Sequence, residues 1–276
     1  MVRLAGLLIL VLLSIGVTSG LDFAPRAHAD HGELTVSIAS VDDSEYPTVR
    51  AVINVDHGGS PLQDLPADQI VATESGATAV ISSLEPVIDA DLPIALVLVI
   101  DISGSVSGEL IAEVQAAAIK LVEQLGPADS AAVISFADQV TVAQELTTDH
   151  SAVVEAIEGL TAFGNTALFD AVGAASKLAT LALVPRSAVV LLSDGAEYGG
   201  FSAATRESSL TDIEGGAPFY VIGVGQWVDL AYLEEVAGRS GGRYFAAGTV
   251  SEIEGVYGTI EELLRSQYVV TLEVAE

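Results

Sequence analysis

The sequence predicts an α/β fold with a mostly parallel sheet, preceded by a small β-sandwich-like domain. From Ile94 onward, continuous apolar runs alternate with amphipathic segments, as buried strands alternate with their covering helices in such folds. Before that point, short β-branched runs are separated by turn residues, with almost no helix signals. Half of the residues are hydrophobic and only 5% are aromatic, which suits an aliphatic core around a buried parallel sheet.

The first 29 residues have the features of a cleavable signal peptide. A short basic start precedes an apolar run from Leu4 to Val17, and Ala27-His28-Ala29 fits the A-x-A cleavage pattern. The run is shorter than the ~20 residues that a membrane-spanning helix needs. We therefore expect cleavage after Ala29 and a secreted or otherwise extracytoplasmic mature protein, with a retained N-terminal anchor as the alternative.

Residues 30–92 are expected to form the small β-rich domain. The segments 34–38 and 49–55 carry β-branched residues in partial alternation. The segments 69–73 and 77–81 flank Ser75-Gly76, which predicts a hairpin.

Residues 93–267 are expected to form the α/β domain. Apolar runs predict strands at 94–100, 131–136, 187–192, 218–224 and 243–246. Amphipathic patterns and helix-end signals predict helices at about 108–125, 150–159, 167–182, 229–239 and 251–266. The last segment, 268–276, returns to β character. It is either a final strand of this sheet or a strand that pairs with the N-terminal β domain.

The net charge of −28 excludes several partners. The chain has 10 Lys and Arg residues but 38 Asp and Glu residues. Its surface therefore repels nucleic acid and anionic membranes, because proteins bind both of these through cationic side chains. We interpret the acidic residues as a solvated coat that keeps the protein soluble, and a high-salt habitat is compatible with it. The absence of Cys excludes disulfides, thiolate metal sites and Cys nucleophiles.

Oxygen-bearing side chains follow the first strand of the α/β domain. A buried strand carries Asp101 to the carboxyl edge of the sheet, where open α/β folds bind ligands. Ser103 and Ser105 follow, and Gly104 allows a sharp bend between them. One carboxylate and two hydroxyls are ligands for a hard cation such as Mg²⁺ or Mn²⁺.

Two further loops are expected at the same edge. Thr166 stands just before a predicted helix, and Asp194 follows a second buried strand. Taken singly, the three hydroxyls read as helix N-caps and Asp194-Gly195 as a turn. Together they predict one site on three loops. Two acids around a dication leave a roughly neutral cluster with an open coordination position that an outside carboxylate could fill.

These motifs resemble the metal-ion-dependent adhesion site of von Willebrand factor type A (VWA) domains. The pattern is Asp101-x-Ser103-x-Ser105, then Thr166, then Asp194-Gly195, and the similarity covers about residues 93–267. It implies a doubly wound, Rossmann-like sheet. It also implies that Asp101, Ser103, Ser105, Thr166 and Asp194 bind a divalent metal, Mg²⁺ or Mn²⁺ with Ca²⁺ as a further possibility, and that an acidic residue of a protein partner completes the shell.

The chain departs from the family at two positions, and its domain order resembles a bacterial secreted subgroup. Ser193 stands where Thr is usual, and Asn165 stands where Gly is common. The segment Glu197 to Phe201 borders the site and is a candidate for partner choice. Asp170 is expected either to support the site loops or to be solvated. For Trp227 we expect packing, with an exposed interaction anchor as the alternative.

The functional prediction is a secreted metal-dependent adhesion or interaction module and not an enzyme. One alternative is an extracellular structural protein whose metal only braces loops. Another is a metal-dependent phosphatase-like enzyme with Asp101 as nucleophile, but that chemistry wants an acid at the position of Ser103.

Overall fold

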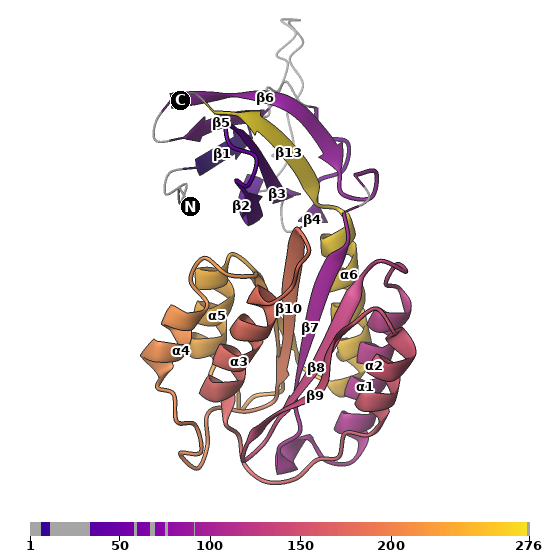
Figure 1. Cartoon of the computed structure of the whole chain (residues 1–276). Helices are drawn as coiled ribbons and strands as arrows, with labels where there is room; N and C mark the ends of the chain where they lie inside the picture. Colours follow the sequence, from indigo (N-terminus) through magenta and orange to yellow (C-terminus); the bar gives the residue numbers. More distant parts are fainter. Residues whose placement is uncertain are drawn as a thin grey trace, which may run out of the picture. The chain divides into compact units, whose positions relative to one another are not determined.

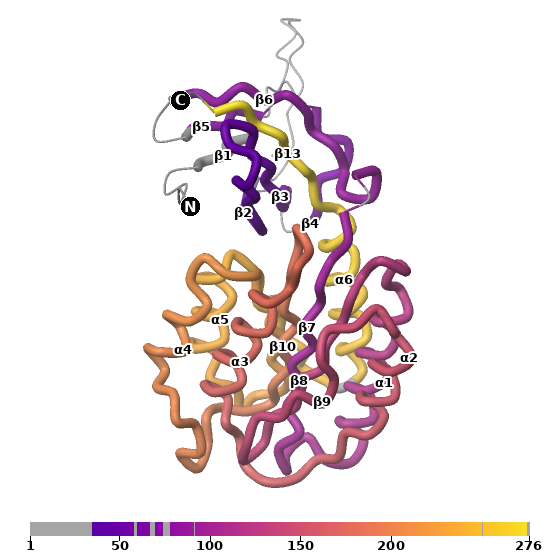
Figure 2. Tube along the Cα trace, in the orientation of Figure 1, coloured from indigo at the N-terminus to yellow at the C-terminus, as the bar shows by residue number. Residues whose placement is uncertain are grey.

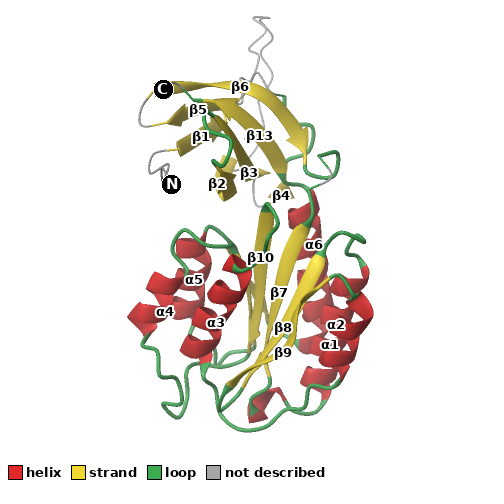
Figure 3. Cartoon of the chain, in the orientation of Figure 1, coloured by secondary structure: helices red, strands yellow, loops and turns green. Residues whose placement is uncertain are grey.

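The computed structural model describes residues 7–11, 34–57, 60–66, 70–74, 77–90 and 92–274. The chain divides into two compact units. One is a β unit formed by Met1–Ala90 and Arg265–Glu276, and the other is an α/β unit formed by Asp91–Leu264. The α/β unit is therefore inserted into the sequence of the β unit. The regular elements of the β unit that the structure describes are strands, whereas strands and helices alternate along the α/β unit (Figure 3).

The β unit is one antiparallel sheet in the order β1-β5-β6-β13-β3-β2, with β4 paired to β3. The strands are β1 (Leu7–Val11), β2 (Leu34–Asp42), β3 (Thr48–His57), β4 (Ser60–Pro61), β5 (Ile70–Glu74), β6 (Ala77–Pro86) and β13 (Tyr268–Glu273). The predicted hairpin is confirmed as β5 and β6. Strand β13 lies between β3 and β6, so the C-terminal segment pairs with the N-terminal β unit (Figure 2).

This sheet curls over its own hydrophobic core. Along β3, Val49, Ala51 and Ile53 are buried while Arg50 is exposed, which is the alternation of a strand with one covered face. Ala72 of β5 belongs to the same cluster, although β6 and β13 separate β5 from β3 in the sheet. The predicted sandwich-like domain is thus a single continuous sheet.

The predicted signal peptide overlaps this unit. Residues Leu7–Val11 form β1, which pairs antiparallel with β5 from Leu7↔Glu74 to Val11↔Ile70. The proposed cleavage site at Ala27–Ala29 lies outside the described residues, so cleavage stays a prediction. In the described part of the chain, no helix combines the length and the apolar character that crossing a membrane requires.

The α/β unit has a six-stranded sheet in the order β12-β11-β10-β7-β8-β9. All neighbours are parallel except β8 and β9. The strands are β7 (Ile94–Asp101), β8 (Ser130–Phe136), β9 (Val140–Thr147), β10 (Arg186–Ser193), β11 (Phe219–Val224) and β12 (Arg243–Ala247). The helices are α1 (Glu109–Glu123), α2 (His150–Glu158), α3 (Leu168–Thr180), α4 (Arg206–Asp212), α5 (Leu230–Ser240) and α6 (Ile253–Arg265).

Helices cover both faces of this sheet, which confirms the doubly wound prediction (Figure 1). All eight residues of β7 are buried, and those from Leu96 to Ile100 alternate between two cores. Leu96, Leu98 and Ile100 face the core that α1, α2 and α6 cover. Val97 and Val99 face the core under α3, α4 and α5. Because both faces of this strand are covered, its sequence is a continuous apolar run.

Two elements of the α/β unit, a strand and an α-helix, go beyond the predicted set. Strand β9 is an antiparallel edge strand whose sequence, VTVAQELT, is partly or fully exposed along its length, so it lacks the run of a buried strand. Helix α4 has seven residues, of which only Ser209 and Leu210 are buried. It begins at a capping box between Thr205 and Ser208. With seven residues, it is too short to show a helical periodicity of apolar residues in the sequence.

Candidate metal centre

The candidate site lies at β7, where the order in which the chain adds strands to the sheet reverses direction. From β7 the chain proceeds to β8 on one side, and β10 lies on the other side of β7. Parallel pairing aligns Leu192 with Ile100, which places Ser193 and Asp194 beside Asp101 at the carboxyl edge. Ligands of open α/β sheets bind at such switch points.

Asp101 is fully buried and held in a fixed orientation. Its Oδ1 accepts a hydrogen bond of 2.8 Å from the backbone N–H of Ser103. Its Oδ2 accepts one of 2.7 Å from the hydroxyl of Ser193. Ser193, which stands where Thr is usual, therefore still supplies a hydroxyl that binds Asp101.

A chain of hydrogen bonds joins the two serines to the second acid. The hydroxyls of Ser103 and Ser105 lie 3.0 Å apart, and Ser105 donates to Asp194 at 2.8 Å. Ser103 is buried, whereas Ser105 is exposed, so this chain runs from the interior to the surface. The structure thus brings four of the five predicted ligands together.

The fifth predicted ligand, Thr166, lies on a loop that contacts both the loop after β7 and the loop after β10. Gly104 donates from its N–H to the carbonyl of Gly164 at 3.0 Å, and Tyr198 donates to the carbonyl of Thr166 at 3.1 Å. The Thr166 side chain is buried, and its hydroxyl lies 4.0 Å from where a Cβ on Gly195 would stand. Within the described residues it shares no hydrogen bond with the other four side chains.

The readings of these hydroxyls as helix caps are wrong. Helix α1 begins after Gly108, and neither it nor the short helical turn after Ser103 has a side-chain cap. Helix α3 begins after Ala167, again without one. Its first amides are satisfied elsewhere, because Phe169 donates to Glu197 at 3.1 Å and Asp170 donates to Ser202 at 3.2 Å. None of the hydroxyls of the three predicted ligands is therefore used to cap a helix.

Burial makes the charged forms of both acids unfavourable. It raises the pKa of Asp101 from 3.8 to about 6, against the lowering effect of the hydrogen bonds from Ser103 and Ser193. It also raises the pKa of Asp194, which the hydrogen bond from Ser105 opposes. Neither acid belongs to any ion pair of the described residues.

The donor set fits a hard divalent cation. A cation between Asp101 and Asp194 would supply the missing countercharge, and hydroxyl and carboxylate oxygens are ligands that such ions prefer. In the described part of the chain, no three His, Cys, Asp or Glu side chains form a metal-binding group. The candidate centre therefore depends on its hydroxyls.

Several supporting residues carry no signal in the sequence. Asp138 accepts two hydrogen bonds of 2.7 Å from Asn165, one from the backbone and one from the side chain, and so fixes the Thr166 loop. A side chain on Gly164 would collide with the Asp138 carboxylate, and its φ of +75° also favours glycine. No local pattern marks Asp138 among the many acids of this chain.

Hydrogen bonds hold the loop after β10 on both sides of its exposed tip, at Glu197 and at Ala203 and Ala204. Glu197 accepts hydrogen bonds from Ser202 and from the start of α3. Asp170 accepts from the N–H groups of Ala203 and Ala204 at 2.9 and 2.7 Å. Asp170 thus supports a loop next to the site and is not merely solvated. The tip itself exposes Tyr198 and Phe201.

The expected packing role of Trp227 is wrong. Its side chain is 87% exposed, just beyond the end of β11. Among the described residues, the loops at this edge therefore present four aromatic side chains to solvent: Phe163, Tyr198, Phe201 and Trp227.

The family model for the von Willebrand factor type A domain matches residues 95–259, which is more than half of the chain and includes all five predicted ligands. The chain belongs to this family. A UPF0353 protein of Mycobacterium avium is 27% identical to the chain over 238 residues, covering 74% of this chain and 70% of the relative.

Solved structures share the VWA fold at low identity. A von Willebrand factor type A protein from Catenulispora acidiphila has a TM-score of 0.57 at 14% identity, covering 86% of this chain and 51% of that one. The chain thus spans about half the length of that protein. The PilB minor pilin of Streptococcus sanguinis has a TM-score of 0.53 at 14% identity, covering 84% and 79%. Proximal thread matrix protein 1 of the mussel byssus, whose adhesion-site motif is occupied by zinc, has a TM-score of 0.54 at 21% identity, covering 67% and 48%.

Proposed function

We propose that this VWA domain is a secreted, metal-dependent protein-binding module. Its divalent cation, Mg²⁺ or Mn²⁺ with Ca²⁺ as an alternative, would be held by Asp101, Ser103, Ser105, Thr166 and Asp194. One observation carries the proposal. A fully buried carboxylate, in no ion pair of the described residues, stands at the end of a hydrogen-bonded chain of hard oxygen donors that reaches the surface. The zinc-occupied motif of the mussel protein supports a metal at the equivalent fold position.

An acidic residue of a protein partner is the proposed last ligand. The bound cation would supply a positive charge in a surface that otherwise repels acids. Two carboxylates of the chain neutralise a dication and leave room for a third. Exposed aromatic side chains at the same edge are typical of protein interfaces, whose binding energy concentrates in such residues.

Binding is favoured over catalysis by the residues around the centre. Ser103 stands where a phosphotransfer enzyme with Asp101 as nucleophile would need a general acid. Export is supported by the predicted signal peptide and by the shared fold of a minor pilin. A net charge of −28 suits a soluble protein outside the cytoplasm.

Metal binding is tested by calorimetry with Mg²⁺, Mn²⁺ and Ca²⁺. We expect one site that Asp101→Ala abolishes, while the far-ultraviolet circular dichroism of the domain is unchanged. Glu145→Ala is the control, because Glu145 is an acid on β9 away from the centre. Equal heats of binding in wild type and Asp101→Ala would refute the metal assignment.

Partner chemistry is tested with a random peptide library displayed on phage, panned in Mg²⁺ and eluted with chelator. We expect the enriched peptides to share an Asp or Glu whose change to Asn or Gln removes binding. Metal binding without any chelator-sensitive peptide would show instead that the ion only braces the loops.

A further inference from the structure

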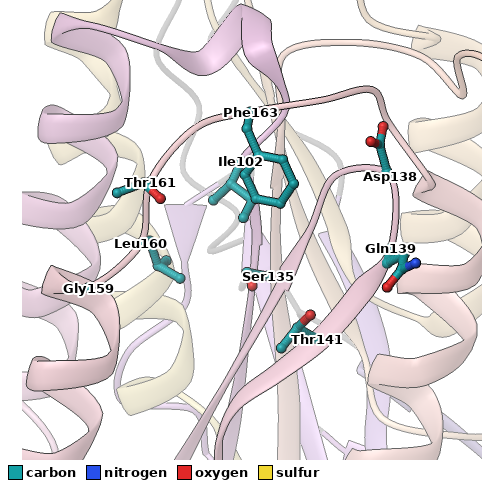
Figure 4. Close-up of a pocket in the computed structure, with 9 residues that line it drawn as sticks. All are labelled: Ile102, Ser135, Asp138, Gln139, Thr141, Gly159, Leu160, Thr161 and Phe163. Atoms are coloured by element: carbon teal, nitrogen blue, oxygen red, sulfur yellow. The ribbon is translucent and has the colours of Figure 1, made fainter.

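A hollow of about 480 Å³ opens beside the metal-centre loops. Ile102, which separates Asp101 from Ser103, and Phe163, which precedes Gly164, lie on one side of it (Figure 4). Residues of β8, β9 and the turn between them lie on the other side. Its volume falls within the roughly 300–1,000 Å³ of small-molecule sites. None of the five proposed metal ligands lines it.

The uncharged polar side chains of this hollow form no hydrogen bonds within the described chain. Ser135, Thr141, Thr161 and Gln139 all line it, and none of their side chains forms a hydrogen bond within the described chain. Ser135 as a whole is only 4% exposed, but its hydroxyl oxygen is not one of the enclosed side-chain atoms that lack a partner, so it is accessible from the hollow. A hydroxyl that opens into the hollow and forms no bond within the described chain can donate to and accept from a ligand there.

Two of these hydroxyls form a pair on one face of the sheet. Ser135 of β8 and Thr141 of β9 are directly opposite each other in the antiparallel register, and directly opposite residues project to the same face. Figure 4 shows them close together below Phe163. Each hydroxyl can donate one hydrogen bond and accept others. The pair therefore suits a ligand that carries both donors and acceptors.

Apolar surface stands opposite the hydroxyls. The Phe163 ring is 56% exposed at the rim, and Ile102 is buried below it. Phe163 donates from its N–H to the carbonyl of Ile102 at 2.7 Å, which fixes the ring's backbone at this position. An aromatic face with hydroxyl and amide groups around it is complementary to a molecule with one apolar face and a hydroxylated edge.

The charge of the lining excludes an anion. Asp138 is the one ionisable group among the described residues that line the hollow, and its Oδ1 already accepts two hydrogen bonds from Asn165. No Lys or Arg of the described chain lines it. A carboxylate or phosphate ligand would therefore meet a like charge without compensation.

We propose that this hollow binds a neutral carbohydrate. The sugar's C–H face lies on Phe163, and its hydroxyls bond to Ser135, Thr141, Thr161 and Gln139. This site shares none of the five proposed metal ligands, so a sugar and a protein partner would be separate ligands of the same edge of the sheet.

The test uses the whole protein in chelator, with the methyl glycosides of glucose, galactose and mannose as probes in saturation-transfer NMR, and an array of neutral and acidic glycans. We expect binding of neutral glycans. Phe163→Ala should weaken it at least roughly fivefold. Phe201→Ala should leave it unchanged, since Phe201 is an exposed aromatic outside this hollow.

Removing single hydroxyls gives a second measure that does not alter the fold. Thr141→Val and Thr161→Val keep the branched shape and should each weaken binding roughly two- to tenfold. Thr148→Val, at a position outside the hollow, should have no effect. The proposal is overturned if no neutral glycan binds in either assay. It is also overturned if only amino sugars bind and Asp138→Asn abolishes that binding, which would identify a cation site.

Discussion

Ser105 donates a hydrogen bond of 2.8 Å to Asp194, a residue 89 positions away in the sequence, and so joins the loop after β7 to the loop after β10. Ser105 is exposed and Asp194 is half-buried, so the bond lies near the surface. It shows how two loops that are distant in sequence become one site at the edge of the sheet.

Asp194→Ala should weaken Mg²⁺ binding at least roughly tenfold, which corresponds to about 1.4 kcal/mol. The variant removes one of two charges and the acceptor of Ser105. Calorimetry measures the affinity, and thermal unfolding in chelator should show an unchanged melting temperature. An unchanged affinity would remove Asp194 from the shell.

Asp101→Asn should stabilise the metal-free protein at pH 7.5. Asn is isosteric, can still accept from the Ser103 N–H and can donate to the Ser193 hydroxyl, but it carries no buried charge. The rise in the Asp101 pKa from 3.8 to about 6 corresponds to roughly 3 kcal/mol as an upper value. Urea unfolding in chelator measures the difference in the free energy of unfolding.

The same pair of proteins gives a pH test of this electrostatic explanation. A carboxyl whose folded pKa is raised stabilises the fold when protonated, and this contribution disappears as the pH rises from about 4 through about 6. The advantage of Asp101→Asn should therefore shrink between pH 7.5 and pH 5. A constant advantage across this range would mean that packing, and not charge, separates the two proteins.

Much of the α/β unit could be predicted because its residues follow simple physical rules. Eight buried positions in β7 leave an unmistakable apolar run, and Asp101 at its end marks the carboxyl edge of the sheet. The anchoring roles of Glu197 and Asp138 could not be predicted, because Glu197 binds Phe169, 28 positions away, besides the nearby Ser202, and Asp138 binds Asn165, 27 positions away. Nothing local separates either acid from the other acids of the chain. Strand β9 escapes prediction because an exposed edge strand has no apolar run to detect.

Glu197→Gln should loosen the loop after β10 without removing the metal. The Glu197 carboxylate accepts three hydrogen bonds, and both of its oxygens take part. In Gln an NH2 group replaces one of these oxygens and would face a hydrogen-bond donor. We expect faster amide hydrogen exchange at residues 198–204 and Mg²⁺ affinity within roughly threefold of wild type. Glu145→Gln is the matched control. Unchanged exchange would show that Asp170 alone anchors the tip.

Two glycines near the end of α5 offer a contrast in stability. A Cβ on Gly242 would overlap the backbone of Phe219, so Gly242→Ala should force β12 away from β11 and destabilise the unit by several kcal/mol, on the order of 3. A Cβ on Gly238, inside α5, would meet nothing within 4 Å. Gly238→Ala should therefore raise stability by roughly 0.5–1 kcal/mol. Thermal unfolding of both variants compares them directly, and similar losses would contradict the close approach of β12 to β11.

The position of β13 between β3 and β6 governs the order in which the protein can fold during synthesis. Because β13 follows the whole α/β unit in the sequence, the ribosome must release that unit before the first-made strands can close their sheet. The inserted α/β unit has all of its strands and helices available earlier. A nascent chain stalled before β13 should therefore already resist protease through the α/β unit while its N-terminal strands are still digested.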